Sequence, residues 1–127
     1  MKRDLELIRE ILLAVEEKSD AANIMPAEKL DLPGRSIAEI NYHLLLLDEA
    51  GYLRCIDNSS DNEIRYYVLR LTWEGHEFLD AARSTTNWTK AKSVIGGVGS
   101  FTLEIVKKVL ADIALQSARS ALNLPPG

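Results

Sequence analysis

The sequence has little cysteine, histidine or proline: one Cys, two His and four Pro in 127 residues. The single cysteine, Cys55, cannot form an internal disulfide and has no second cysteine with which to hold a metal ion. Neither His43 nor His76 is followed by another ligand at the close spacing that zinc sites use. We therefore expect no disulfide framework, no metal site and a cytoplasmic location.

Long apolar runs are also lacking. The longest uncharged stretch that could suggest a membrane helix, residues 93–103, has eleven residues, whereas a helix that spans a bilayer needs about twenty. The first ten residues, MKRDLELIRE, are charged from the second position and lack the apolar centre of a secretory signal. With 46% apolar and 27% charged residues, the composition is typical of a globular domain that does not contact a membrane.

Positive charge is scarce in the part of the chain where a nucleic-acid binder would need it. Residues 1–51 carry six Lys and Arg against eleven Asp and Glu, a net charge of −5. Residues 52–92 carry six of each, and residues 93–127 carry three against two. Because phosphate neutralisation supplies much of the affinity for nucleic acids, this distribution favours a partner other than DNA.

Two helices are predicted in the first half of the chain. Residues 4–17 are expected to be helical because apolar residues recur there at helical spacing. Ser36 followed by Glu39 is a capping-box pattern that predicts the start of a second helix. Gly51 predicts that this helix ends after Ala50, since glycine readily adopts the left-handed conformation of a helix stop.

A β-hairpin and a third helix are predicted next. Residues 52–56 and 64–71 are rich in β-branched and aromatic residues, and a polar turn separates them. Residues 24–26 form a further candidate strand. Thr72 is expected to cap a helix over residues 73–83.

The C-terminal third begins with a polar connection, residues 84–92, in which a short helix is possible. A glycine-rich joint over residues 93–100 and a long amphipathic helix over residues 101–122 follow. The apolar face of this helix is the candidate oligomer interface: Ile105, Val106, Val109, Leu110, Ile113, Ala114 and Ala118. Because that face must be covered and the joint permits exchange between copies, we expect a homo-oligomer, most simply a dimer.

A helix that leads directly into a hairpin and then another helix is the order that a winged-helix module needs. The predicted fold class is therefore α+β: a winged-helix-like domain over residues 1–92 with a two-stranded wing, followed by the joint and an added long C-terminal helix.

Three segments carry a family resemblance: the opening MKRDLELIR, the central YHLLLLDEAGYL and the motif LTWEGHEFLD at residues 71–80. Over residues 1–92 the chain resembles a family of small bacterial and phage proteins catalogued as a domain of unknown function (two-five-one-three). The resemblance implies a winged-helix-like organisation and frequent residence in prophages or other mobile elements. It implies no activity.

The chain is also similar to winged-helix regulators, in which residues 36–50 would be the recognition helix and residues 55–64 the wing. The candidate nucleic-acid contacts are then Arg35, Asn41, Arg54 and Arg65. The sequence departs from such regulators in two respects. Only a turn fits between Pro26 and Leu32, where they have a helix, and the recognition helix has no Lys or Arg after Arg35.

No residue pattern predicts a reaction. Cys55 has no neighbouring base and is interpreted as a small buried apolar residue. His76 shares a helical face with Trp73 and Leu79 and is interpreted as a packed or capping histidine. The glycines of residues 96–99 lack the Lys-Ser/Thr pair of a phosphate-binding loop. We expect no enzymatic activity, no cofactor and no small-molecule substrate.

Two functions stay open. The first is a non-enzymatic, self-associating module that docks a macromolecular partner. A protein partner is favoured over DNA, because the four consecutive leucines of residues 44–47 point around most of the middle helix. The second is a DNA-binding transcription regulator of the winged helix-turn-helix type.

Overall fold

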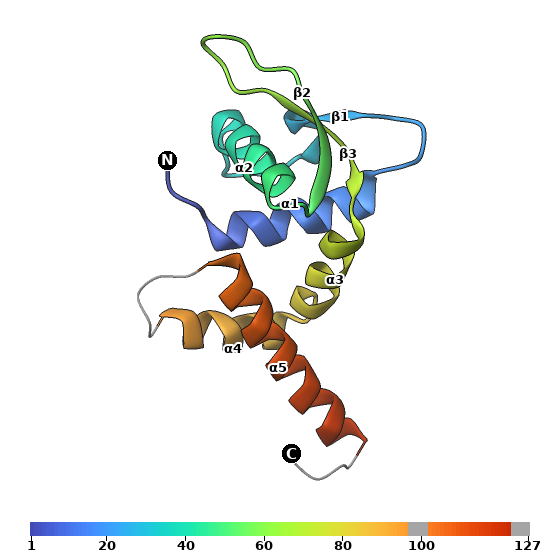
Figure 1. Cartoon of the computed structure of the whole chain (residues 1–127), viewed down its shortest axis with the longest axis vertical. Coiled ribbons are helices and arrows are strands. Elements are labelled where there is room, and N and C mark those ends of the chain that lie inside the picture. Colours follow the sequence, from blue (N-terminus) through green and yellow to red (C-terminus); the bar gives the residue numbers. More distant parts are fainter. Residues whose placement is uncertain (97–101, 123–127) are drawn as a thin grey trace. The chain divides into compact units, whose positions relative to one another are not determined.

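The structure is a computed structural model that describes residues 1–96 and 102–122. Over these residues it contains five α-helices, one short 3-10 helix and a three-stranded antiparallel sheet (Figure 1). The α+β class predicted from the sequence is confirmed. The chain divides into two compact units, residues 1–79 and 80–127, and each is described by itself. The three-part division predicted from the sequence stays a prediction.

Helix α1, Leu5–Lys18, begins one residue after the predicted start, with Asp4 as its N-cap. The Asp4 side chain accepts a hydrogen bond from the Leu7 N–H and so satisfies one of the free amides of the first turn. One face of the helix is buried, as its apolar spacing predicts. That face consists of Leu7, Ile8, Ile11, Leu12, Ala14 and Val15.

Two short elements follow α1. The strand β1, Met25–Pro26, confirms the candidate strand, and η1, Ala27–Leu30, is a single 3-10 turn. Asp31 has a φ of 54°, a left-handed conformation that ends this turn. A full second helix is therefore absent between β1 and Leu32 in the described structure.

Helix α2, Ile37–Glu49, contains the predicted capping box: the Ser36 and Glu39 side chains each accept from the other residue's backbone N–H at 3.0 Å. Gly51 has a φ of 82° and ends the helix as predicted. Within the leucine run, Leu44 and Leu47 are buried, whereas Leu45 and Leu46 are half-buried. One small core thus does not cover the whole circumference of this helix.

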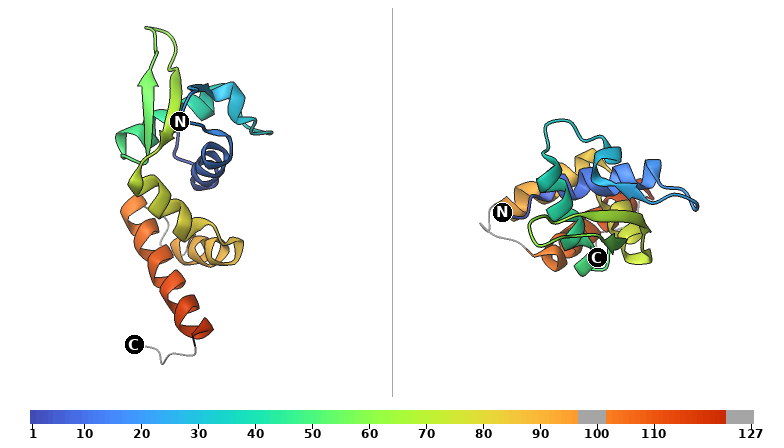
Figure 2. Two further views of the ribbon diagram at one scale, coloured as in Figure 1. Left: turned by 90° about the vertical axis from the view of Figure 1, so that its right-hand side faces the viewer. Right: turned by 90° about the horizontal axis from the view of Figure 1, so that it is seen from above.

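The sheet places β3, Tyr66–Leu71, between β1 and β2, Leu53–Asp57, with antiparallel pairing on both sides. The β2–β3 hairpin extends beyond the helices of the first unit (Figure 2). Its inner residues alternate with exposed ones, and α1, η1 and α2 cover the buried side. Arg54 of β2 pairs with Arg70 of β3, and the next residue of β2, Cys55, pairs with Val68. Leu69 therefore has no partner on β2, and the strand register shifts at this point, as in a β-bulge.

Helix α3, Trp73–Ala82, starts immediately after β3. Thr72 caps it as predicted, since its Oγ1 accepts from the Gly75 N–H at 3.0 Å. The same hydroxyl donates to the Gly51 carbonyl at 2.5 Å, which ties the helix start to the end of α2. His76 is exposed, so it is not a packed histidine, and the capping alternative stays a prediction. The face that it shares with Trp73 is a solvent face.

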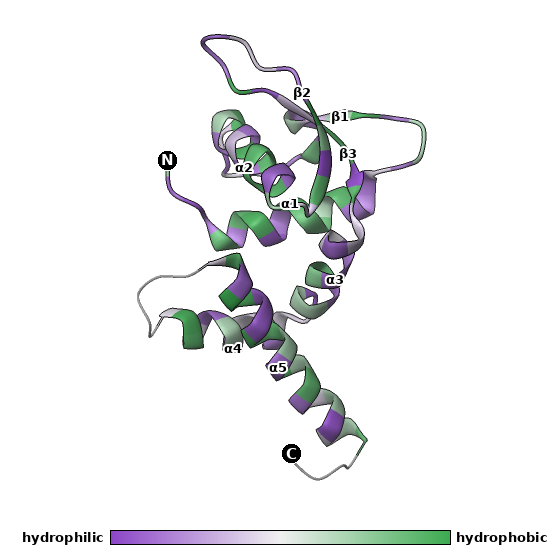
Figure 3. Ribbon diagram, viewed as in Figure 1, coloured by the Kyte–Doolittle hydropathy of each residue, from purple (hydrophilic) through white to green (hydrophobic). Residues whose placement is uncertain are grey.

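The second unit contains α4, Thr85–Gly96, and α5, Leu103–Ala121, which pack against each other. The short helix that was left open within the polar connection of residues 84–92 is present, and it is longer than expected, with twelve residues that reach Gly96. It forms because Trp88, Ala91 and Ile95 make a buried stripe at helical spacing. The first residues of the predicted glycine joint, 93–96, also lie in α4, and residues 97–100 lie outside the described residues. Helix α5 is confirmed, with apolar and polar residues alternating along it (Figure 3).

Candidate functional site

Arg35, the first candidate nucleic-acid contact, is held by two carboxylates of the protein. Its guanidinium pairs with Asp4 at 2.5 Å and with Glu10 at 3.1 Å. Partial burial acts to raise the pKa of the Asp4 carboxyl, but the Leu7 N–H and Arg35 outweigh it and hold that pKa below its ordinary value. The Asp4 hydrogen bond correspondingly raises the pKa of Arg35. Arg35 thus fastens the loop before α2 to the start of α1.

Arg65 is held in a similar way. Its guanidinium pairs with Glu28 at 3.2 Å and with Glu63 at 3.7 Å, and it lies over the Tyr67 ring at 5.6 Å from the ring centre. These contacts join the hairpin to η1. A phosphate group that approached Arg65 would meet both carboxylates as well.

Asn41 is a buried structural residue. Its side chain, 2% exposed, donates to the Ile37 carbonyl at 3.1 Å and accepts from the Tyr66 N–H at 2.9 Å. The second bond satisfies an amide at the start of β3 and fixes α2 against the sheet. Of the four candidate contacts, only Arg54 is exposed and has no ion pair in the part of the chain that the structure describes.

An open, mostly apolar groove of about 560 Å³ lies where α2 meets the hairpin, and we call it the α2–hairpin groove. Its lining residues are Met1, Ile37, Ala38, Asn41, Tyr42, Asn62, Glu63 and Ile64. Ile37 is 39% and Ile64 40% exposed. The lining of this groove is therefore mostly apolar, and Glu63 carries the one charged side chain among its lining residues.

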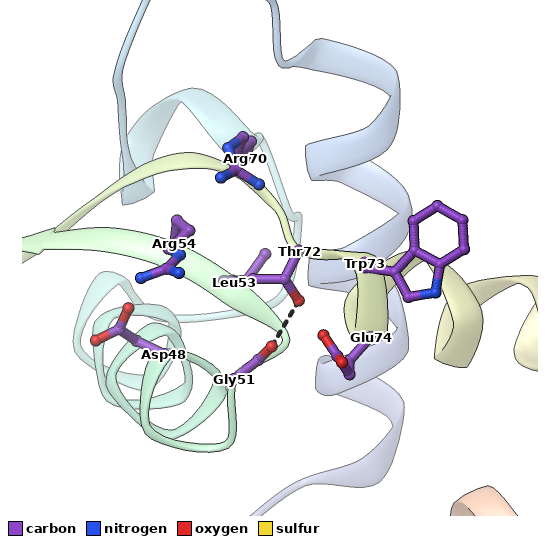
Figure 4. Close-up of a pocket in the computed structure, with 8 residues that line it drawn as sticks. All are labelled: Asp48, Gly51, Leu53, Arg54, Arg70, Thr72, Trp73 and Glu74. Atoms are coloured by element: carbon purple, nitrogen blue, oxygen red, sulfur yellow. Dashed lines mark hydrogen bonds between the residues drawn. The ribbon is translucent and has the colours of Figure 1, made fainter.

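A second groove lies at the opposite end of the hairpin, and we call it the Trp73 groove (Figure 4). It is lined by Asp48, Gly51, Leu53, Arg54, Arg70, Thr72, Trp73 and Glu74. The arginine side chains project from neighbouring strands, and the Trp73 ring extends away from the start of α3. Sequence reasoning did not find this groove, because it depends on the register shift after Arg54, which no residue pattern announces.

His43 is buried and links two helices. Its Nε2 accepts from the Asp4 N–H at 2.8 Å, and its Nδ1 lies 2.8 Å from the Glu39 carbonyl oxygen. This pairing assigns the ring hydrogen to Nδ1. The ring therefore holds the start of α1 against α2. No cluster of three or more potential metal ligands occurs in residues 1–96 and 102–122.

Cys55 is partly buried on β2, and its backbone N–H donates to Asp48 at 3.0 Å. Burial, and secondarily the negative charge of Asp48, raise the pKa of the Cys55 thiol to about 12. The thiolate, which is the nucleophile, is therefore scarce at neutral pH.

The expected result is slow labelling of Cys55 in the folded protein. At pH 8 a disulfide reagent such as Ellman's reagent should react at least about a hundred-fold more slowly than with the urea-unfolded chain, whose thiol has a pKa near 8.5. The rate should keep rising with pH through pH 10. A rate that levels off near pH 8 would contradict the raised pKa.

The candidate oligomer interface on α5 is partly covered by its own unit. Val106 and Leu110 are fully buried, Val109, Ile113 and Ala114 are half-buried, and Ile105 and Ala118 are exposed. Leu115, which was not predicted to take part, is 53% exposed. The interface thus stays a prediction, now centred on the residues that the second unit leaves uncovered. Among the described helices, none combines the length and apolar character needed to cross a membrane.

Comparison with known proteins identifies the family. The model described as "Hypothetical protein (DUF2513)" matches residues 2–100. The chain belongs to this family, as the sequence motifs predicted. An uncharacterized protein of Haemophilus influenzae is 37% identical over 117 residues, which cover 91% of this chain and 98% of that protein. No solved structure matches the chain.

Five of the ten residues of the LTWEGHEFLD motif have a structural role in this DUF2513 chain. Leu71, Phe78 and Leu79 are buried, and Thr72 caps α3. Gly75 is required because a Cβ at this position would lie 2.1 Å from the Tyr52 carbonyl oxygen. The other five residues of the motif are exposed, and among them Trp73 is the large apolar one, with 75% of it exposed.

Proposed function

We propose that this chain is a non-enzymatic winged-helix-like module that docks a protein partner in the α2–hairpin groove and self-associates through α5. The winged-helix reading is supported by the element order α1, β1, η1, α2, β2, β3 and by the sheet order β1-β3-β2. Residence in prophages or other mobile elements, and action in the cytoplasm, belong to the same proposal and are supported by the family resemblance and the single cysteine.

The apolar lining of the α2–hairpin groove is the observation that carries this proposal. Exposed apolar side chains that converge on a concave surface typically mark sites of protein–protein contact. Ile37 and Tyr42 come from α2 and Ile64 from the hairpin, so an inserted apolar side chain would contact both elements. A recognition helix for DNA would instead present donors to base edges and phosphates.

The ion pairs of the arginines favour a protein partner for a second reason. Binding of DNA by Arg35 or Arg65 would require release of their carboxylate partners, and those carboxylates would then repel the phosphates. A protein partner that fills the apolar groove can bind while the ion pairs of Arg35 and Arg65 stay intact.

Photo-crosslinking in cells tests the docking site. A photo-reactive amino acid in place of the exposed Ala38 should give a discrete protein adduct. Ile64→Glu should abolish the adduct, because it places a charge in the apolar groove. The matched control is Ile24→Glu, which changes an isoleucine that is 48% exposed and lies outside this groove. A nucleic-acid adduct, or equal loss in both variants, would contradict the proposal.

The alternative is a DNA-binding transcription regulator, and the specific observation in its favour is the exposed Arg54 on the hairpin. An anisotropy titration with labelled duplex DNA at low and high salt decides between the two. A regulator should bind at low salt and lose affinity steeply as salt rises. We expect no saturable binding at either salt concentration.

Self-association is expected to depend on the apolar stripe of Ile105, Val109 and Ile113, which recurs every four residues along α5. Ile105→Asp together with Ile113→Asp should convert the protein from a dimer to a monomer in size-exclusion light scattering. The control replaces Lys107 and Ala111, which lie on the opposite side of α5 from this stripe, by Asp and should leave the dimer mass unchanged. A monomeric unmodified chain would remove this part of the proposal.

A further inference from the structure

Two arginines of the Trp73 groove face each other on neighbouring strands. Arg54 and Arg70 are direct partners in the β2–β3 register, and both are exposed. Neither has a carboxylate within ion-pair distance among the described residues, and the hydrogen bond of the Arg70 side chain goes to the Leu71 carbonyl at 3.2 Å. Like charges directly opposite each other disfavour pairing of the strands. Stability of the sheet therefore does not explain this arrangement.

The register shift is what brings the two arginines together. Along β3, Tyr66 and Val68 point inward, so simple alternation would turn residue 70 inward as well. The extra residue Leu69 reverses the alternation, so Leu71 becomes buried and Arg70 exposed. Bulges commonly redirect a side chain at a functional position. Here the bulge adds a second guanidinium beside the first.

Trp73 is the third feature of this groove. It lies in the family motif, yet it is 75% exposed, while Leu71, Phe78 and Leu79 of the same motif are buried. The other tryptophan of the chain, Trp88, is 2% exposed. The Trp73 ring extends away from the two arginines, but all three residues line the same groove (Figure 4). A groove that combines an exposed tryptophan with two arginines has the composition of a protein-binding hot spot, since Trp and Arg are among the residue types most enriched there.

We propose that the Trp73 groove is a docking site for an acidic protein segment. Carboxylates of that segment pair with the Arg54 and Arg70 guanidinium groups, and an apolar side chain of the segment covers the Trp73 ring. The guanidinium pair suits this chemistry because each group offers a planar set of donors to a carboxylate. Once paired, the two arginines no longer repel each other.

The other charges in the groove favour a protein segment over nucleic acid. Asp48 and Glu74 line the same surface, where they would repel a continuous phosphate backbone. A peptide carries its charges at separate positions and also has backbone N–H groups that can donate to these carboxylates. The Trp73 groove and the α2–hairpin groove share no lining residue. An experiment can therefore reject partner binding at one groove without rejecting it at the other.

The test is an anisotropy titration of the full chain with a labelled peptide of alternating glutamate and leucine. Saturable binding is expected, with a shift of the Trp73 fluorescence to shorter wavelength. Arg54→Gln with Arg70→Gln, and separately Trp73→Ala, should each weaken binding at least about ten-fold. The double variant should also melt at the same or a higher temperature, because it removes the like-charge pair.

The matched control removes two positive charges elsewhere, by Lys29→Gln with Lys90→Gln, both of which are exposed. It should bind the peptide like the unmodified chain. Absence of saturable binding, equal weakening by the control, or tighter binding of a single-stranded oligonucleotide than of the peptide would each overturn the proposal. A lower melting temperature of the arginine double variant would show that the pair has a structural role and would also overturn it.

Discussion

Replacement of Gly75 by alanine is expected to destabilise the first unit by at least about 2 kcal/mol, because overpacking a well-packed site typically costs about 1–3 kcal/mol and here the contact is with backbone. A Cβ at position 75 would lie 2.1 Å from the Tyr52 carbonyl oxygen and 3.2 Å from the Leu71 side chain. Relief of this contact would require the Tyr52 backbone or α3 to move. The carbonyl that would be displaced accepts the Thr72 N–H at 3.1 Å.

Helix propensity alone predicts the opposite change in stability for Gly75→Ala. In an exposed helix interior, alanine is more favourable than glycine by about 1 kcal/mol. At position 75 the close approach of α3 to Tyr52 outweighs that gain. The Thr72 hydroxyl bond to Gly51 and the packing of Phe78 against the Tyr52 ring, at 5.2 Å between ring centres, both depend on the same approach.

Gly96→Ala is the matched control, since Gly96 also lies in a helix but its Cβ would meet nothing within 4 Å. It should leave stability unchanged or raise it slightly. Urea unfolding followed by circular dichroism measures both variants. If Gly75→Ala unfolded at the same urea concentration as the unmodified chain, α3 could not lie as close to Tyr52 as the structure shows.

The local elements of the fold could be predicted because their signals are local. The Ser36–Glu39 capping box, the glycine stop at Gly51 and the Thr72 cap each depend on a few neighbouring residues, and all three are confirmed. Helix α4 was predicted only in part, as a possible short helix within a polar connection. Its polar composition suggested a connection, whereas the spacing of Trp88, Ala91 and Ile95 was the signal that could have identified it.

The candidate site could be predicted only in part, because its residues are positioned by long-range contacts. The sequence identified Arg35 and Arg65 as exposed positive charges, but their partners Glu10 and Glu28 lie 25 and 37 residues away in the chain. Asn41 was grouped with these residues as a polar group on a recognition helix, yet it is buried against β3. The pairing of Arg54 with Arg70 depends on a bulge whose position cannot be read from alternation alone.

His43→Ala is expected to lower the free energy of unfolding by about 3 kcal/mol, because it leaves a cavity in the core and removes the acceptor of a partly buried amide. His43 is 1% exposed, and its Nε2 is the partner of the Asp4 N–H. The Asp4 side chain in turn caps α1 and pairs with Arg35. By holding the Asp4 backbone in place, the His43 ring supports both the helix cap and the ion pair. Loss of the ring should therefore loosen the start of α1 first, which hydrogen exchange of the Leu7 and Ile8 amides would detect.

His43→Gln separates the hydrogen bond from the lost volume. A glutamine carbonyl can reach the Asp4 N–H, so this variant should recover part of the stability that His43→Ala loses. His76→Ala is the control: His76 is exposed on α3, and its replacement should change stability by less than about 0.5 kcal/mol. If His43→Ala and His76→Ala had equal small effects, the hydrogen bond between His43 and Asp4 could not be what joins α2 to the start of α1.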